Sequence, residues 1–173
     1  MNFNLENVDD FKRLKSKVEH HSDTIEGVVD AIIKPYSEDL DKYVSFIKDC
    51  LKDGEKSPTD EELDDFCLNL STLIYFSGGM CEYLGIREDI SKAIYKEMYH
   101  DSRSKLDGGT VADKDSLAEL ASQQEALVSV CYTRAAKLMR SKVENAQELL
   151  SSCKKVLTRR MQEYNLTQQA GGK

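Results

Sequence analysis

Residues 113–164 read DKDSLAELASQQEALVSVCYTRAAKLMRSKVENAQELLSSCKKVLTRRMQEY and contain neither glycine nor proline. Mainly apolar side chains recur here every three or four residues, a spacing that places them on one side of an α-helix. The members of this stripe are Leu117, Leu120, Ala121, Gln124, Leu127, Val128, Cys131, Ala135, Leu138, Ala146, Leu149, Cys153, Leu157, Met161 and Tyr164. The pattern predicts a long C-terminal helix over residues 111–165, followed by a flexible tail over residues 166–173.

A single helix of that length is longer than the diameter of a small domain. We therefore expect it either to turn back as a helical hairpin or to pack against other copies of the chain as a coiled coil. The stripe is interrupted at Lys142 and Asn145. A polar residue in a helical seam can fix the register or the oligomeric state, or it can mark the point where the helix breaks.

Shorter helices are predicted upstream. One runs from about residue 5 to 33 and is closed or reset by Pro35, and a second runs from about residue 36 to 51. After a loop at 53–58, a third begins near residue 59, either with Ser57 as its cap and Pro58 next, or with a Thr59-x-x-Glu62 capping box. Gly85 is expected to end it, and a fourth helix covers residues 87–100. The dipeptide Gly108-Gly109 predicts a turn before the long helix.

These patterns predict an all-α helical bundle, with the long C-terminal helix or hairpin used for oligomerisation. We divide the chain into an acidic N-terminal helical segment over residues 1–52, central helices over residues 57–100 and the C-terminal helix, together forming one domain. A disordered chain is not expected, because apolar residues recur at helical spacing through most of the sequence.

The five cysteines are an odd number and form no C-x-x-C pair. They lie among apolar residues at helical spacing, which predicts buried free thiols in a reducing compartment. The N-terminus shows no signal-peptide pattern, and the most apolar stretch, around residues 66–76, is too short and too polar to span a bilayer. We expect a cytoplasmic protein, in the host cytoplasm if a phage encodes it, without membrane contact.

No catalytic or cofactor motif is present, so the chain is predicted not to be an enzyme and to need no cofactor. Acidic clusters occur at Asp9-Asp10, at 60–62 and at Asp64-Asp65. Neighbouring carboxylates on a helix diverge, whereas a hard cation needs several oxygens that converge. No metal site is therefore predicted.

The net charge of −7 is unevenly distributed. Residues 131–173 carry nine basic and three acidic side chains, so the rest of the chain is strongly acidic. Two basic groups stand out: one at 92–105, interleaved with Tyr95 and Tyr99, and one along the C-terminal helix. Bases can stack on tyrosine while lysine and arginine bind phosphates, which makes single-stranded DNA the first candidate ligand. The candidate nucleic-acid contacts are Lys92, Lys96, His100, Arg103, Lys105, Arg134, Lys137, Arg140, Lys154, Lys155 and Arg159. In the competing interpretation, these side chains are solvated or pair with the acidic body.

The stretch AIYKEMYH at 93–100, a glycine-containing loop, and a long helix with YTRAA at 132–136 and SSCKK at 151–155 resemble phage recombination mediators of the UvsY type. The resemblance covers roughly residues 87–164. It implies a small helical protein that assembles into rings, binds single-stranded DNA and helps to load a RecA-like recombinase. It also implies that Lys92, Lys96, His100, Arg103 and Lys105 fall where that family places nucleic-acid contacts.

The acidic N-terminal part supports a different hypothesis. Blocks of acidic residues can imitate a phosphate backbone and occupy a basic groove on another protein. The alternative function is therefore a phage-type inhibitor or assembly protein that binds a protein partner through an acidic helical surface. One continuous acidic face would favour this alternative, and scattered acids would favour plain solubility.

Overall fold

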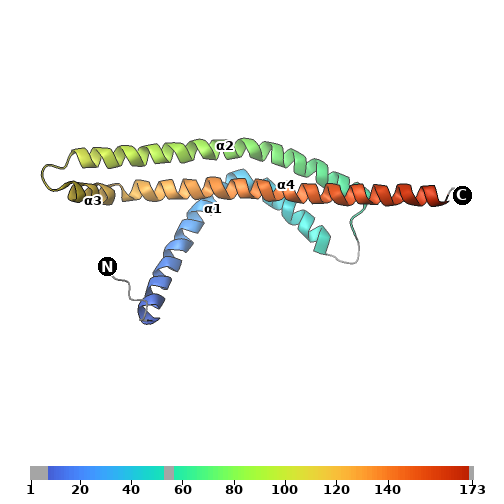
Figure 1. Ribbon diagram of the computed structural model, residues 1–173, viewed down its shortest axis with the longest axis horizontal. Coiled ribbons are helices and arrows are strands. Elements are labelled where there is room, and N and C mark those ends of the chain that lie inside the picture. Colours follow the sequence, from blue (N-terminus) through green and yellow to red (C-terminus); the bar gives the residue numbers. More distant parts are fainter. Residues whose placement is uncertain (1–7, 53–56, 172–173) are drawn as a thin grey trace. The chain divides into compact units, whose positions relative to one another are not determined.

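The computed structural model describes residues 8–52 and 57–171. Within those ranges the chain forms four helices and no strand, which confirms the predicted all-α helical bundle (Figure 1). They are α1 (Val8–Lys52), α2 (Asp60–Ser104), α3 (Val111–Ala121) and α4 (Gln123–Gly171).

The helices are shared between two compact units. Unit 1 comprises Met1–Lys34 with Glu88–Ala135, and unit 2 comprises Pro35–Arg87 with Ala136–Lys173. Each of the three long helices contributes one part to each unit.

In unit 2, parts of α1, α2 and α4 bury residues at regular intervals along each helix. Leu63, Leu70, Ser77 and Leu84 of α2 are buried at intervals of seven residues. Leu40 and Ile47 of α1, like Ala136 and Val143 of α4, repeat at the same interval. A seven-residue repeat keeps one seam of each helix facing its neighbours. Arg160, near the end of α4, binds Asp60 at the start of α2, so these two helices run antiparallel.

In unit 1, the buried residues of α3 and α4 are small. Ala118, Ser122, Ser129, Cys131 and Ala135 are all buried. Small side chains allow helix backbones to approach closely but bury little apolar area each. The hydrophobic effect therefore contributes less here per residue than in the leucine-rich core of unit 2.

Two predicted helix breaks are wrong. Helix α1 continues through Pro35, and α2 continues through Gly78, Gly79 and Gly85. Local propensity is a weak preference that tertiary packing overrides. Pro35 itself is exposed, while Ile33 and Ser37 on either side are buried and hold the helix in place.

The C-terminal stretch is two helices, and they are divided at Ser122 rather than at Lys142 or Asn145. The Ser122 hydroxyl and backbone N–H both donate to the carbonyl oxygen of Ala118, at 2.8 and 3.0 Å. Ser122 is fully buried, so this local bonding satisfies its polar groups. Helix α4 then continues through residues 166–169, which the sequence had predicted to be a flexible tail.

Capping residues fix where α2 and α3 begin. Glu62 accepts hydrogen bonds from the Thr59 backbone N–H and hydroxyl at 2.7 and 3.1 Å, and the Thr59 hydroxyl accepts from the Glu62 N–H. Of the two predicted starts for α2, this confirms the capping box. Thr110 and Asp113 form the same motif before α3. The predicted turn is also confirmed, since Gly108 and Gly109 have positive φ angles of 80° and 83°, which favour glycine.

Candidate nucleic-acid interface

The basic group at the end of α2 is largely neutralised within unit 1. Lys92 binds Glu88 at 2.6 Å, Lys105 binds Asp101 at 2.6 Å, and the Arg103 Nε donates to Asp115 at 2.5 Å. Lys96 and His100 are exposed. A carboxylate close to a base weakens its attraction for phosphate, so Lys92, Arg103 and Lys105 are weaker candidate contacts. Lys96 and His100 are the stronger candidates on this helix.

The tyrosines between these bases serve packing. The Tyr99 hydroxyl donates to Asp115 at 3.1 Å, and its ring contacts those of Tyr95 and His100. Burial and the hydrogen bond to Asp115 raise the pKa of Tyr99, so its hydroxyl stays protonated near neutral pH. Because this ring is half-buried and bonded to α3, it is not free to stack on a base.

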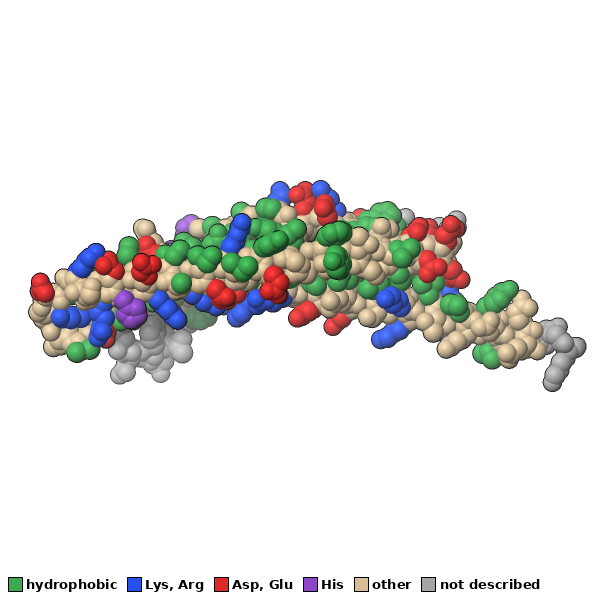
Figure 2. All heavy atoms as spheres, turned by 90° about the horizontal axis from the view of Figure 1, so that it is seen from above, with side chains coloured by type: hydrophobic (Ala, Val, Ile, Leu, Met, Phe, Trp, Pro, Cys, Tyr) green, Lys and Arg blue, Asp and Glu red, His purple; other side chains and the backbone are tan. Residues whose placement is uncertain are grey.

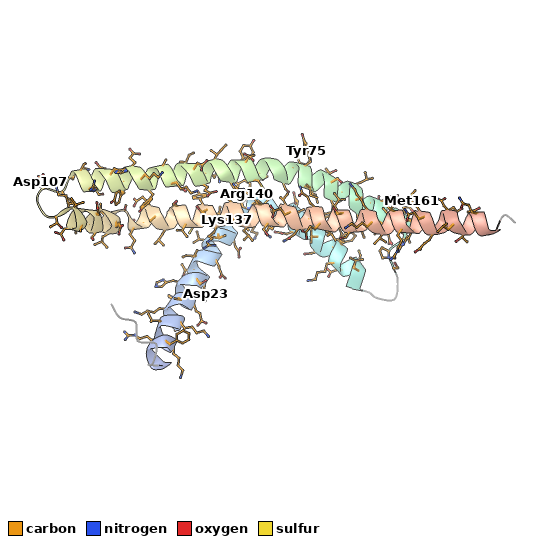
Figure 3. The ribbon with its side chains drawn as sticks, in the orientation of Figure 1. Asp23, Tyr75, Asp107, Lys137, Arg140 and Met161 are labelled. Carbon is orange, nitrogen blue, oxygen red and sulfur yellow. The ribbon has the colours of Figure 1, made fainter. Side chains whose placement is uncertain are left out.

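Two of the predicted α4 contacts lie beside α2. A Cβ added at Gly85 would lie 3.5 Å from the Arg140 guanidinium, and Figure 3 places Arg140 between the two helices. Burial raises the pKa of the Cys81 thiol, and the nearby Arg140 charge partly offsets that rise. Burial likewise raises the pKa of the Cys67 thiol, and the nearby Lys154 charge partly offsets that rise. These two cations therefore face α2 of the same unit.

All six predicted contacts on α4 are exposed. Besides Arg140 and Lys154 they are Arg134, Lys137, Lys155 and Arg159, and Arg159 pairs with Glu163 at 3.6 Å. Lys137 and Lys155 are eighteen residues apart, which is five turns, so they lie on one line about 27 Å apart. Glu144 and Glu148 lie between them on the same side of the helix. The exposed surface therefore offers two separate points of positive charge rather than a continuous track.

Two further bases of α4 were not assigned from the sequence and have structural roles. Lys142 donates to both oxygens of Asp41 in α1, at 2.6 and 2.7 Å. Arg160 donates to the Pro58 carbonyl oxygen at 2.6 Å and to Asp60 at 2.8 Å. The interruption of the apolar stripe at Lys142 was the sequence signal for the first contact. It marks a polar position in the seam, not a break in the helix.

The acidic residues show the same pairing within the chain. Asp41 and Asp60 bind bases of α4, Asp115 binds Arg103, and Glu38 binds Lys42 at 2.8 Å. Asp64 and Asp65 near the start of α2 are exposed. Charge pairing between the acidic body and the basic helix, which the sequence left open, thus occurs at two of these points, Asp41 and Asp60.

The thiols and carboxylates form no metal site within the described residues, and all five cysteines are free. Cys67, Cys131 and Cys153 are buried, whereas Cys50 and Cys81 are half-buried. The His20-His21 pair is exposed. The side chains of Asp9 and Asp10 lie outside the described residues. A search of the helices within the described ranges found none with a stretch apolar enough to cross a bilayer.

Comparisons of the chain with protein-family models, with curated proteins and with solved structures gave no match.

Proposed function

We propose that the protein is a non-enzymatic accessory protein that binds single-stranded nucleic acid along the exposed side of α4. The supporting observation is the alignment of Lys137 with Lys155, each beside an exposed arginine, Arg134 and Arg159 respectively. A flexible single strand can bend to reach two positive points about 27 Å apart. A rigid duplex would need charge along the whole contact. By resemblance, loading a RecA-like recombinase is the process that this binding would serve.

Salt dependence tests the proposal quantitatively. Each phosphate contact releases counterions, so four contacts predict a slope of log affinity against log salt of about −2.8. Replacing Lys137 and Lys155 by glutamine should reduce the slope by about 1.4 and weaken binding at low salt. Fluorescence anisotropy with a labelled oligo-dT measures both quantities.

The matched control replaces two bases that are neutralised in the structure. Lys92→Gln with Lys105→Gln removes the same formal charge from unit 1, and each of these lysines pairs with a neighbouring carboxylate. We expect this control to keep the wild-type slope. If the slope decreased equally in both double variants, net charge rather than the α4 surface would determine binding. No binding by the wild type at low salt would refute the proposed function.

A protein-binding function is the second candidate, and the apolar surface of α2 favours it. Tyr75 is 79% exposed and projects from α2 away from α4 (Figure 3). Leu68, Phe76 and Tyr83 are also exposed on this helix. Monomeric proteins rarely expose large contiguous apolar patches without an interaction to cover them. Asp64 and Asp65 lie beside this surface and add an acidic rim. This candidate predicts that Tyr83→Asp abolishes partner binding and leaves the nucleic-acid slope unchanged.

A further inference from the structure

The first half of α1 is an amphipathic helix whose apolar side is open to solvent. We call residues 11–28 the arm. Phe11, Val18 and Ile25 recur at intervals of seven residues, and Leu14 and Val28 lie on the same side. Ser22 and Ile25 are half-buried, while the other arm residues are exposed, Val18 to 67%. An isolated helix of this length is marginally stable in water, so burial of its apolar side would stabilise it.

In unit 2, α2 is apolar on two opposite sides. One side forms the core, and the other carries the exposed residues Leu68, Tyr75, Phe76, Tyr83 and Ile86, which we call the outer face. Figure 2 shows hydrophobic side chains gathered along α2. The sixteen residues from Phe66 to Cys81 include no charged side chain.

Two features make the outer face suitable for a docked helix. Gly79 lies in its middle, and a Cβ added there would meet nothing within 4 Å, so a neighbouring helix can approach closely. An open groove of about 470 Å³ adjoins the face, lined in part by Tyr43 and Phe46 of α1 and by Thr72 and Leu73 of α2. The apolar surface therefore extends from α2 onto α1.

The charges of the arm and of α2 are complementary in one orientation. The arm begins with a basic group, Lys12, Arg13, Lys15 and Lys17, and its later charged residues, Glu19, Asp23 and Glu26, are all acidic. Helix α2 begins with acids up to Asp65 and is then uncharged as far as Cys81. A parallel alignment places Lys15 and Lys17 near Asp64 and Asp65, and Val18 near Leu68. An antiparallel alignment would bring the arm's acids toward those of α2.

Parallel docking would require the arm of the same chain to reverse its direction relative to the rest of α1. Within unit 2, Phe46 of α1 contacts Phe66 of α2, while the earlier Tyr36 contacts the later Arg87. Helix α1 thus runs antiparallel to α2, and the arm is the continuation of α1 in one unbroken helix. We propose that the arm of a second copy of this chain docks parallel to α2 on the outer face, so that two copies exchange arms. This surface is separate from the proposed nucleic-acid contacts on α4.

Exchanging the charges tests this interface directly. Variant A reverses the arm (Lys15→Glu, Lys17→Glu), and variant B reverses the face (Asp64→Lys, Asp65→Lys). In an A–A or a B–B pair, each arm meets a face of the same charge, so both contacts are repulsive. In an A–B pair, the reversed arm of A meets the reversed face of B, and the native arm of B meets the native face of A. Both contacts are then attractive.

Sedimentation equilibrium of the full chain provides the readout. We expect the wild type to self-associate, each variant alone to associate more than about tenfold more weakly, and the equimolar mixture to recover the wild-type affinity. Val18→Asp should also dissociate the wild type, whereas Leu166→Asp, an exposed apolar position near the end of α4, should not. Circular dichroism verifies that each variant remains helical.

Three results would overturn the proposal: a wild type that is monomeric at all concentrations, variants that keep the wild-type mass, or a mixture of A and B that stays dissociated. A monomeric wild type would mean that the outer face binds a different protein, not a second copy. The third, with dissociated variants, would mean that the arm folds back on its own chain. Because α4 is unaltered, both variants are expected to keep the wild-type slope of log affinity for nucleic acid against log salt. Failure of the arm interface can therefore be distinguished from failure of the proposed nucleic-acid binding.

Discussion

The contact between Lys142 and Asp41 ties α4 to α1 in unit 2, and a double-mutant cycle can measure its strength. The two N–O distances are 2.6 and 2.7 Å, and the Ser37 hydroxyl donates to the same carboxylate at 2.7 Å. The side chain of Lys142 is 28% exposed and that of Asp41 46%. The perturbation consists of Lys142→Met, Asp41→Asn and the combination of both.

The expected coupling follows from this geometry. At an effective dielectric constant of 20, two charges at this distance attract by about 6 kcal/mol before desolvation is counted. Removing both groups partly from water, and fixing the long lysine side chain, offsets most of that attraction. We therefore expect a coupling free energy of about 1 to 2 kcal/mol. Ser37 should hold the Asp41 carboxylate in place when Lys142 is replaced.

Urea unfolding followed by circular dichroism measures the free energy of unfolding for the four proteins. The pair Lys105 and Asp101 is the control, because its charges are also 2.6 Å apart but its side chains are 72% and 47% exposed. Its coupling should be no more than about 0.5 kcal/mol. A coupling at Lys142 as small as that of the control would refute the reasoning, because the seam position would then contribute only an ordinary surface pair.

Three other predictions concern stability. Leu70→Ala, in the fully buried core of unit 2, should cost about 2 to 5 kcal/mol in urea unfolding, whereas Leu166→Ala should cost less than about 0.5 kcal/mol. Gly108→Ala should destabilise the turn before α3 by about 1 kcal/mol, because its φ is 80°; an unchanged unfolding midpoint would contradict that reason. Hydrogen bonds from the Thr110 side chain and backbone lower the pKa of Asp113. Because the pKa of Asp113 is lowered in the folded state, ionisation of its carboxyl stabilises the fold above the ordinary carboxyl pKa of about 4. That stabilisation is lost as the pH falls through the lowered pKa. NMR titration of Thr110→Ala should show the Asp113 pKa returning toward its ordinary value, and an unchanged pKa would assign the shift to another cause.

The sequence alone determined that the chain is helical and where the turn before α3 falls. Spacing of three and four residues, a capping box at Thr59 and the glycine pair at 108–109 are local signals that act within one turn of the chain. They therefore predicted the helices, the start of α2 and the turn before α3. Local signals failed at Pro35 and Gly85, because packing against other helices outweighs the propensity of one residue.

Only the tertiary structure decided the availability of charges whose partners come from another helix. Lys92, Arg103 and Lys105 matched the pattern of a nucleic-acid site as well as Lys137 and Lys155 did. The carboxylate opposite Arg103 comes from another helix, and no sequence spacing reveals that distance. The same holds for α2, whose apolar residues all fit a core pattern, although the structure buries one side and leaves the other exposed. Residue type and spacing fix which face of a helix is apolar, but which faces find a partner depends on the packing of the whole chain.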